Sequence, residues 1–278
     1  MDYAEALQAG SDIHLKDIQY FNLAETLDCG QAFRYEKKDN GYEGIAYGRR
    51  ISLLQNGGNL ILKDMSLQEF ESTWKEYFDL QRDYGRLRSL LVEHGGHPMK
   101  LATEFSPGLR HMRQDPWEML VSFILSQHTN IPRIKTMIRR LCENFGERLP
   151  CGGYTFPSSE KLAKLNTDEL ATVKCGYRAK FIIDAARRAA DGRFNPNELK
   201  NLETPKIREE LQKIHGVGPK VADCVLLLGF GRTEVCPVDV WIKRALEKYF
   251  PTGLPKKLAP YAGLAQQFLF HFIRNVSE

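Results

Sequence analysis

The sequence predicts an α+β protein in which a strand-rich N-terminal domain, residues 1–100, precedes a mostly helical region, residues 101–278. Short strand-like segments with turn signals run from residue 13 to residue 63, whereas beyond about residue 100 the apolar residues recur with helical spacing. The stretch Gly95-Gly96-His97-Pro98 is typical of an irregular connecting segment, so we expect the domain boundary between residues 90 and 107.

The N-terminal strands are predicted to pair as two hairpins, each closed by a Gly-containing turn. Residues 32–35 pair with 42–47, and residues 51–54 pair with 60–62. Ser66 and Glu69 then have the spacing of a capping box, which opens an amphipathic helix. The buried face of this helix is expected to carry Phe70, Trp74, Tyr77 and Phe78.

The helical region begins with a clear start signal. Asp115-Pro116-Trp117-Glu118 combines an N-cap, a first-turn proline and a glutamate at N3, and the helix is expected to end in the polar run 126–130. A second helix has its apolar residues on one face and stops at Gly146. Further helices are predicted from Ser159, from Ala179 to Asp191-Gly192, from Thr204-Pro205, and from Tyr261 to Arg274.

Residues 211–246 predict a helix, a hairpin, a second helix, a loop and a third helix. The turn His215-Gly216-Val217-Gly218 places two glycines where the backbone bends sharply or approaches a partner closely, and its outward amides suit a phosphate. Lys220 follows in the first helical turn, where the helix dipole disfavours an ammonium and favours the nucleophilic amine. Asp239 is placed to cap the helix from Val240. Each motif alone is common: such lysines are usually solvated and such aspartates are usually only caps.

The composition describes an ordinary intracellular protein. A net charge of +4 permits nucleic-acid binding without requiring it. The six cysteines are scattered without a CxxC pair, which argues against a zinc site or an iron–sulfur cluster and favours reduced thiols. The sequence has no signal peptide and no apolar run of membrane length.

The segment GVGPKVADC, followed by the tripeptide VDV, resembles the helix-hairpin-helix (HhH-GPD) DNA glycosylases. Further matches narrow the resemblance to the 8-oxoguanine DNA glycosylase/AP lyase family and extend it over nearly the whole chain. They are CGQAFRYE at 29–36, RQDPWEMLVSFILSQHTNIPRI at 113–134, GYRAKF at 176–181 and YAGLAQQFLF at 261–270. The resemblance implies an N-terminal antiparallel twisted β-sheet domain, followed by helical domains with the active cleft between helical bodies.

The same resemblance implies roles for individual residues. Lys220 corresponds to the lysine that attacks the sugar C1′, and Asp239 to the aspartate that assists it. Gly30 matches the glycine whose carbonyl receives the N7 hydrogen of the oxidised base. The remaining residues of the base pocket are Cys224 and Phe270, which sandwich the flipped base, and Gln266, which reads its pairing edge. No redox cofactor or catalytic metal is implied.

A second set of positions is expected to contact DNA. Arg133 and Arg178 match arginines that contact the cytosine left behind, and Tyr177 matches a tyrosine wedged beside it. His128 departs from the family, which has an asparagine filling the vacated stack, and Trp241 stands where some relatives have a histidine near phosphate.

The hairpin is expected to contact both DNA and a cation. Gly216 and Gly218 belong to its predicted phosphate-binding turn. The carbonyls of Gln212, Ile214 and Val217 fall where such proteins hold a structural cation, monovalent or divalent.

The predicted function is therefore excision of 8-oxoguanine from double-stranded DNA, followed by strand cleavage through a lysine Schiff base. Two alternatives stay open: a glycosylase for another damaged purine, such as an alkylated one, and a non-catalytic hairpin DNA-binding protein. Lys220 favours the lyase over the first, and Asp239 with the GQAF stretch disfavours the second. We expect a monomer without membrane contact. The chain ends eight residues after Phe270 without a basic tail, which favours a prokaryotic cytoplasmic protein.

Overall fold

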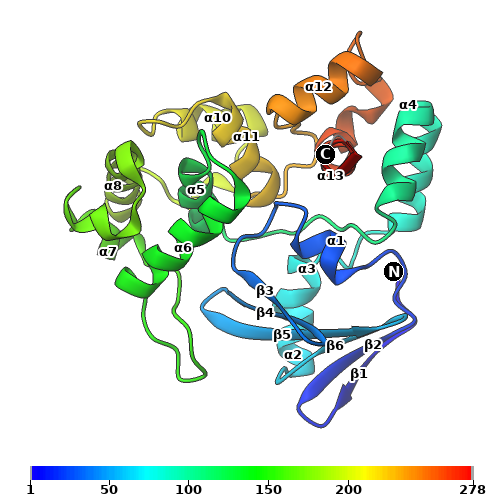
Figure 1. Ribbon diagram of the computed structural model, residues 1–278, viewed down its shortest axis with the longest axis horizontal. Helices are drawn as coiled ribbons and strands as arrows, with labels where there is room; N and C mark the ends of the chain where they lie inside the picture. Colours follow the sequence, from blue (N-terminus) through cyan, green and yellow to red (C-terminus); the bar gives the residue numbers. More distant parts are fainter. Residues whose placement is uncertain (1, 277–278) are drawn as a thin grey trace.

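A computed structural model describes residues 2–276 and confirms the α+β class. A six-stranded antiparallel sheet in the N-terminal region precedes a mostly helical region (Figure 1). The strands are β1 (Glu5–Ala9), β2 (Asp12–Lys16), β3 (Tyr35–Lys38), β4 (Gly41–Ala46), β5 (Arg49–Asn56) and β6 (Asn59–Leu62). Their order across the sheet is β1-β2-β6-β5-β4-β3.

Both predicted turns join neighbouring strands, but the first predicted strand is displaced. The pairs Lys38↔Gly41 and Asn56↔Asn59 close the two hairpins. Residues 32–34 lie outside β3, because Gly30 has a φ of +100° and the side chain of Gln31 holds this segment against residues 110–114, away from the sheet. Several elements were not predicted, among them the long helix α4 (Tyr84–Phe105), which runs through the expected boundary. The strand β1 has no apolar alternation, and the helix α1 (Leu23–Leu27) is too short to show a helical period.

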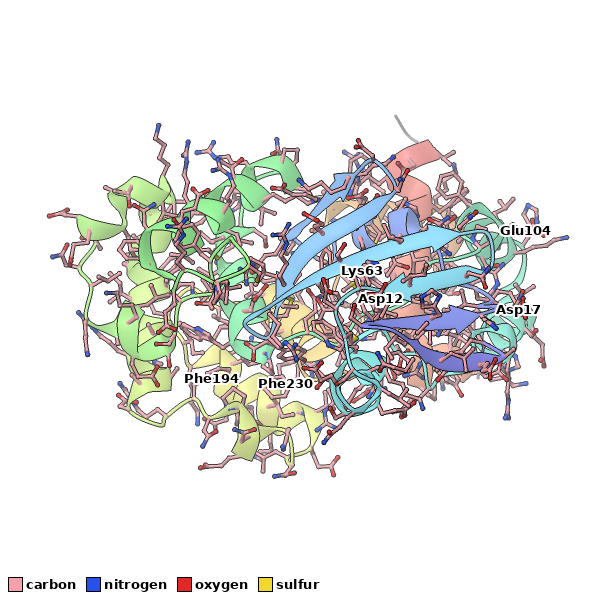
Figure 2. The ribbon with its side chains drawn as sticks, turned by 90° about the horizontal axis from the view of Figure 1, so that it is seen from below. Asp12, Asp17, Lys63, Glu104, Phe194 and Phe230 are labelled. Atoms are coloured by element: carbon pink, nitrogen blue, oxygen red, sulfur yellow. The ribbon has the colours of Figure 1, made fainter. Side chains whose placement is uncertain are left out.

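The sheet buries one face against the helix that follows it. This helix runs through α2 (Leu67–Glu69), the π-helical turn η1 (Phe70–Trp74) and α3 (Lys75–Tyr77), and the predicted capping box of Ser66 and Glu69 is present. Its four predicted core aromatics are buried, with Tyr35 Oη 3.0 Å from Tyr77 Oη. Asp12 of β2 and Lys63 after β6 pair at 2.5 Å, in the view of the sheet given by Figure 2.

The helices predicted beyond residue 107 are confirmed, with small differences at their ends. The elements are α4 (Tyr84–Phe105), α5 (Pro116–Leu125), α6 (Ile131–Phe145), α7 (Ser159–Ala163), η2 (Glu169–Val173), η3 (Gly176–Arg178), α8 (Ala179–Ala190), α9 (Pro196–Leu199), α10 (Thr204–Gln212), α11 (Pro219–Leu228), α12 (Val240–Tyr249), η4 (Lys256–Tyr261) and α13 (Ala262–Val276). Of these, α4, η2, η3, α9 and η4 were not predicted. Gly96 interrupts α4 with a φ of 65°, at the stretch expected to be an irregular connecting segment. The division at residue 100 falls inside α4 and stays a prediction.

Two groups of helices lie above the sheet in Figure 1, with α5 to α8, α10 and α11 in one and α4, α12 and α13 in the other. Each group encloses its own apolar cluster, and a third cluster fills the space between the sheet and its helix. Although they are distant in sequence, α4 and α13 pack side by side. No helix within residues 2–276 has both the length and the apolar composition needed to cross a bilayer.

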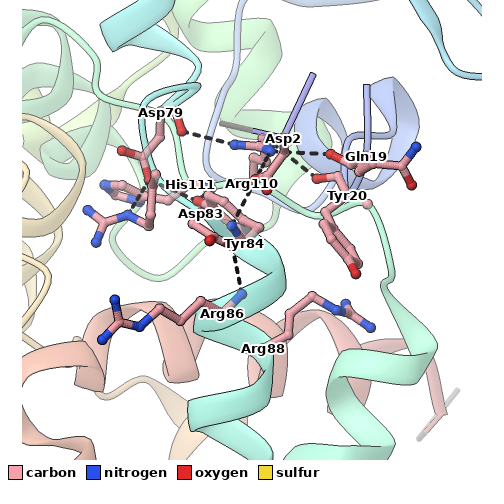
Figure 3. Close-up of polar contacts among 12 residues, drawn as sticks. Asp2, Gln19, Tyr20, Asp79, Asp83, Tyr84, Arg86, Arg88, Arg110 and His111 are labelled. Atoms are coloured by element: carbon pink, nitrogen blue, oxygen red, sulfur yellow. Dashed lines mark hydrogen bonds and ion pairs between the residues drawn. The ribbon is translucent and has the colours of Figure 1, made fainter. Parts of the chain in front are cut away.

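The segment 106–115 connects these bodies, and the fully buried Arg110 fixes it in place (Figure 3). The guanidinium pairs with Asp2 and donates to the carbonyls of Tyr20 (3.1 Å) and Asp79 (3.0 Å). Its Cζ lies 4.2 Å from the centre of the Tyr84 ring. A buried charge is tolerated only when its donors are satisfied, so this network ties the N-terminus and the start of α4 to the connecting segment.

Candidate active site

One large cavity, of about 890 Å³, lies between the two helical groups and the loop around Gly30. This is the volume of a small-molecule site. The predicted catalytic and base-binding residues all line it: Gly30, Lys220, Cys224, Asp239, Gln266 and Phe270. Four of the predicted DNA-contacting residues also line it: His128, Gly216, Gly218 and Trp241. The fold thus brings together residues from five separate segments.

Lys220 and Cys224 face the cavity one turn apart on α11. Pro219 occupies the first helical position, so Lys220 begins the helix directly after the hairpin. The Lys220 Nζ lies 5.2 Å from the centre of the Phe123 ring on α5. Burial raises the pKa of the Cys224 thiol to about 11, although the nearby Lys220 opposes the shift. Cys224 is therefore a neutral apolar surface beside the amine.

Asp239 is the N-cap of α12, as predicted. Its Oδ1 accepts hydrogen bonds from the backbone amides of Trp241 (3.0 Å) and Ile242 (2.9 Å). Within residues 2–276 no hydrogen bond reaches Oδ2, and no ion pair joins Asp239 to Lys220. The cap thus holds the carboxylate rigidly at the cavity wall and leaves one oxygen available to a ligand.

Gly30 occupies a position that only glycine fits. Its φ of +100° is strained for any L side chain, and a Cβ atom there would lie 2.7 Å from Ile131 Cδ1 and 3.4 Å from Phe270 Cε1. The neighbouring Gln31 anchors the loop: its Nε2 donates to the carbonyls of Thr26 and Arg110, and its Oε1 accepts from Met112 N at 2.9 Å. We assigned Gln31 no role from the sequence, although it lies within the GQAF stretch.

Gln266 and Phe270 lie one turn apart on α13 and face the cavity. Gln266 is buried, and its Oε1 accepts a hydrogen bond from Nε2 of Gln267 at 2.7 Å. This contact orients the amide, so that the Nε2 donors of Gln266 are directed to other partners. Phe270 has its ring edge against Gly30, which makes the ring one wall of the pocket.

The turn between α5 and α6 carries His128, with a left-handed φ of 48°. Two neighbours hold this turn. Gln127 donates from Nε2 to the carbonyl of Gly216 at 3.1 Å, and Arg178 donates from Nε to the carbonyl of Gln127 at 3.1 Å. Arg178 is buried and donates also to Cys175 O at 3.1 Å, so in this structure its guanidinium supports the turn and does not line the cavity.

Arg133 and Tyr177 also lie outside the cavity wall. Arg133 is exposed near the start of α6, and Tyr177 is 48% exposed with the Arg178 guanidinium 4.7 Å from its ring centre. The cytosine contacts predicted for Arg133, Tyr177 and Arg178 stay predictions.

The two hairpin glycines differ in the structure. Gly216 has a φ of +85°, and a Cβ there would lie 2.4 Å from the Phe181 ring. Gly218 has a φ of −88° and open space where a Cβ would be. The fold therefore requires glycine at position 216 but not at position 218. An N-cap without a side chain leaves the first amides of α11 unobstructed, which suits a phosphate.

The carbonyls proposed to hold a cation lie at the end of α10 and in this turn. Ile214 O accepts the amide of Val217 at 3.0 Å, while Gln212 is the last helical residue, where carbonyls lack intrahelical partners. In the part of the chain that the structure describes, no three His, Cys, Asp or Glu residues gather as a metal site, and all six cysteines are free.

A Gly-x-Gly hairpin beside a cavity with a lysine and a capping aspartate is the arrangement of the helix-hairpin-helix base-excision glycosylases. The family model for the HhH-GPD superfamily base excision DNA repair proteins matches residues 121–259. The model for the 8-oxoguanine DNA glycosylase N-terminal domain matches residues 13–120. The chain therefore belongs to the 8-oxoguanine DNA glycosylase family, whose enzymes act in base-excision repair.

Individual relatives agree with this assignment. The N-glycosylase/DNA lyase of Saccharomyces cerevisiae is 32% identical over 84% of this chain and 69% of the relative. The 8-oxoguanine glycosylase/lyase of Clostridium acetobutylicum, solved with double-stranded DNA containing cytosine opposite 8-oxoguanine, is 32% identical with a TM-score of 0.94. The structure of MBOgg1 with a low affinity DNA ligand is 39% identical, also with a TM-score of 0.94. Both alignments cover 100% of each chain.

Proposed function

We propose that this enzyme flips 8-oxoguanine out of duplex DNA, removes it, and then nicks the strand by β-elimination through a Schiff base on Lys220. One observation carries the proposal: a single cavity is lined by the amine of Lys220, the carboxylate of Asp239 and the backbone of Gly30. The position of Gly30 is restricted to glycine. The match of the N-terminal family model adds support for the oxidised guanine.

Base flipping comes first, because C1′ and the edges of the base cannot be reached inside a duplex. The unobstructed amides after Gly218 would bind a backbone phosphate and hold the strand at the mouth of the cavity. These contacts offset the cost of unstacking, on the order of a few kcal/mol.

The bond-breaking step uses Lys220 and Asp239. Positive charge develops on the sugar, and the unbonded Oδ2 of Asp239 would stabilise it. The neutral amine of Lys220 bonds to C1′ as the C1′–N9 bond breaks, and the electron pair leaves with the base. The nitrogen then loses one proton and the sugar ring opens, with O4′ taking up a proton, to give the Schiff base. This cation acidifies C2′, whose proton is lost as the 3′ phosphate departs.

Recognition of the lesion rests on Gly30. Guanine has an acceptor at N7, whereas the oxidised base has a donor there. A carbonyl directed at this atom would form a hydrogen bond with the lesion and oppose a lone pair in guanine. Cys224 and Phe270 would hold the two faces of the base, and Gln266 would donate to its pairing edge.

Further parts of the proposal concern partners and surroundings. The hairpin carbonyls of Gln212, Ile214 and Val217 would hold a structural monovalent or divalent cation, and no metal would take part in the chemistry. The six free thiols support a reducing compartment, which we propose is the cytoplasm of a prokaryote, where the enzyme acts as a monomer on DNA.

Borohydride trapping tests this function. The wild-type protein should release 8-oxoguanine from a duplex with cytosine opposite, and should form a covalent adduct when borohydride is added. Lys220→Gln should bind the same duplex without forming the adduct, because Gln lacks the nucleophilic amine. Lys206→Gln, on an exposed face of α10, is the matched control and should trap normally.

Three outcomes would count against the proposal. An adduct of full intensity with Lys220→Gln would remove Lys220 from the chemistry. Release of an alkylated purine in place of 8-oxoguanine would favour the other glycosylase class. Binding without release of any base would favour a non-catalytic hairpin protein.

A further inference from the structure

Among residues 2–276, Arg274 is the one charged side chain of the cavity wall to which neither the sequence nor the proposed function assigns a role. It lies on α13, one turn beyond Phe270, and lines the cavity. A Cβ atom on Gly30 would lie 3.5 Å from Nη1 of Arg274, and the Arg274 Cζ lies 5.9 Å from the centre of the Phe270 ring. The guanidinium is therefore beside the backbone that the lesion's N7 is proposed to meet.

The Nη1 donor of Arg274 is inaccessible to solvent and has no hydrogen-bond partner among residues 2–276. No carboxylate in that range pairs with the guanidinium either. An unpaired buried donor, and more so an unpaired buried charge, is costly. The side chain as a whole is half-buried, so only Nη1 is hidden from solvent. A favourable interaction with the negative end of the α13 dipole would not require this nitrogen to be hidden at the pocket.

The helix that carries Arg274 is held in place by contacts of a neighbouring residue. His271 on the same turn forms a 2.6 Å hydrogen bond between its Nδ1 and the buried Oγ of Ser106. Phe105 packs edge-on against the His271 ring. These contacts join the last turns of α13 to the end of α4, so Arg274 projects from a fixed element.

We propose that Arg274 donates a hydrogen bond from Nη1 to an exocyclic oxygen of the flipped base, beside the N7 that Gly30 contacts. The inference rests on the proposed function and adds a substrate-binding residue to it. In 8-oxoguanine, O8 on C8 and O6 on C6 lie on either side of N7 along one edge of the base, and both oxygens are acceptors. A donor beside Gly30 would therefore lie near one of them if the carbonyl of Gly30 contacts N7. This hydrogen bond would give Nη1 of Arg274 a partner only while the flipped base is bound.

The same contact would assist catalysis. When the C1′–N9 bond breaks, its electron pair leaves with the base and the negative charge spreads onto the exocyclic oxygens O6 and O8. A guanidinium donates a hydrogen bond without losing its proton, so Arg274 would stabilise that charge as it develops. Strand cleavage at a site that has already lost its base involves no such charge, and Arg274 should not affect it.

The first test uses this difference between the two steps. Arg274→Met keeps an unbranched apolar stem and removes the charged donors. Single-turnover excision of 8-oxoguanine opposite cytosine should fall by about tenfold to a hundredfold, the effect of losing one charged hydrogen bond. Cleavage of a duplex with a preformed abasic site should proceed at the wild-type rate. Arg274→Lys, which keeps the charge, should recover part of the excision rate.

Arg86→Met is the control for the general loss of one positive charge, because Arg86 is exposed on α4. It should leave both rates unchanged. Wild-type excision by Arg274→Met would overturn the proposal. An equal fall in both steps, not relieved by Arg274→Lys, would overturn it also, since that pattern belongs to a structural role. Failure of the wild-type protein to excise 8-oxoguanine would reject the proposed function itself, which is a separate outcome.

A binding measurement identifies the oxygen. In a Lys220→Gln background, which stops the chemistry, Arg274→Met should weaken binding to 8-oxoguanine duplex. 8-Oxoadenine has O8 but an amino group in place of O6. Weaker binding to both duplexes supports a contact with O8, and weaker binding to the 8-oxoguanine duplex alone supports one with O6. Unchanged binding to both would overturn the proposal.

Discussion

At the scale of single residues, the proposed mechanism gives Asp239 a structural and a chemical task in one side chain. Its Oδ1 caps α12 through two backbone amides, and its Oδ2 would face the sugar of a bound substrate. The structure confirms the helix cap, and the chemical task stays a prediction. The two tasks can be separated, because asparagine retains the capping oxygen and loses the charge.

Asp239→Asn should lower single-turnover excision by about a hundredfold or more, a loss typical of removing one electrostatic group from an active site. Its thermal unfolding temperature should stay at the wild-type value, since the cap is preserved. Asp239→Ala, measured in parallel, should lose the cap as well and destabilise the protein by about 1 kcal/mol. Wild-type excision by the asparagine variant would reduce Asp239 to a cap.

Gly30→Ala tests the shape of the base pocket, because the substitution keeps the backbone carbonyl that is proposed to accept the hydrogen bond. A methyl group would lie 2.7 Å from Ile131 Cδ1 and close to the Phe270 ring, and φ would stay in a strained region. We expect excision of 8-oxoguanine to fall markedly while affinity for undamaged duplex hardly changes. Single-turnover kinetics and a binding titration measure the two effects. Retention of full excision would show that the glycine only serves the turn.

At the scale of elements, the hairpin between α10 and α11 shows that two similar glycines meet different demands. Gly216 is needed by the fold, since it has a left-handed φ and the Phe181 ring lies against its Cα. Gly218 has an ordinary φ and open space around it. If the second glycine is required, the requirement comes from the DNA backbone that approaches it.

Gly216→Ala should therefore destabilise the protein by about 1–3 kcal/mol in urea unfolding, the usual cost of backbone strain. Gly218→Ala should change the free energy of unfolding by less than about 0.5 kcal/mol, yet weaken binding to duplex DNA. A salt titration of DNA affinity, run on both variants, checks the second effect. DNA binding by Gly218→Ala equal to the wild type would make this glycine a simple connection.

At the scale of the whole molecule, an ion pair joins the loop before β3 to the helical body. Arg34 Nη1 lies 3.2 Å from Oε2 of Glu118 on α5, with both side chains almost completely buried. Burial raises the pKa of Glu118 to about 7, although the Arg34 charge opposes the shift. The folded protein thus holds this proton more tightly than the unfolded chain does.

Stability should therefore respond to pH through Glu118. Its contribution is fully present below its ordinary pKa of 4.5 and is lost as the pH rises to about 7. Glu118→Gln does not titrate, so its free energy of unfolding relative to wild type should increase by on the order of 2–3 kcal/mol between pH 4.5 and 7.5. Urea unfolding across this range measures the difference. A difference that does not vary with pH would contradict the raised pKa.

Wild type must be compared with Glu118→Gln, because a second buried group, His111, changes the stability of the protein with pH in the opposite direction. Burial lowers the pKa of His111 to about 4, so its contribution is present above its ordinary value and is lost as the pH falls below 6.5. His111 is the same in wild type and Glu118→Gln, and its effect cancels in the difference.

The sequence by itself determined the features that depend on neighbours a few residues away. The caps at Ser66, Asp115 and Asp239, the hairpin turn and the amphipathic helices follow from local hydrogen bonds and helical spacing, and the structure contains them. The family motifs also indicated the catalytic and base-binding residues that line the cavity, because each motif is contiguous in the chain.

Only the tertiary structure decided which side chains meet across long distances in the chain. Residues 32–34 leave the sheet because Gln31 bonds to the segment around Arg110, and Arg178 supports the turn at Gln127, away from the cavity wall. Arg274 reaches Gly30 because α13 lies against the loop that follows α1. These outcomes depend on which buried donors find acceptors once the core is packed, and local sequence does not contain that information.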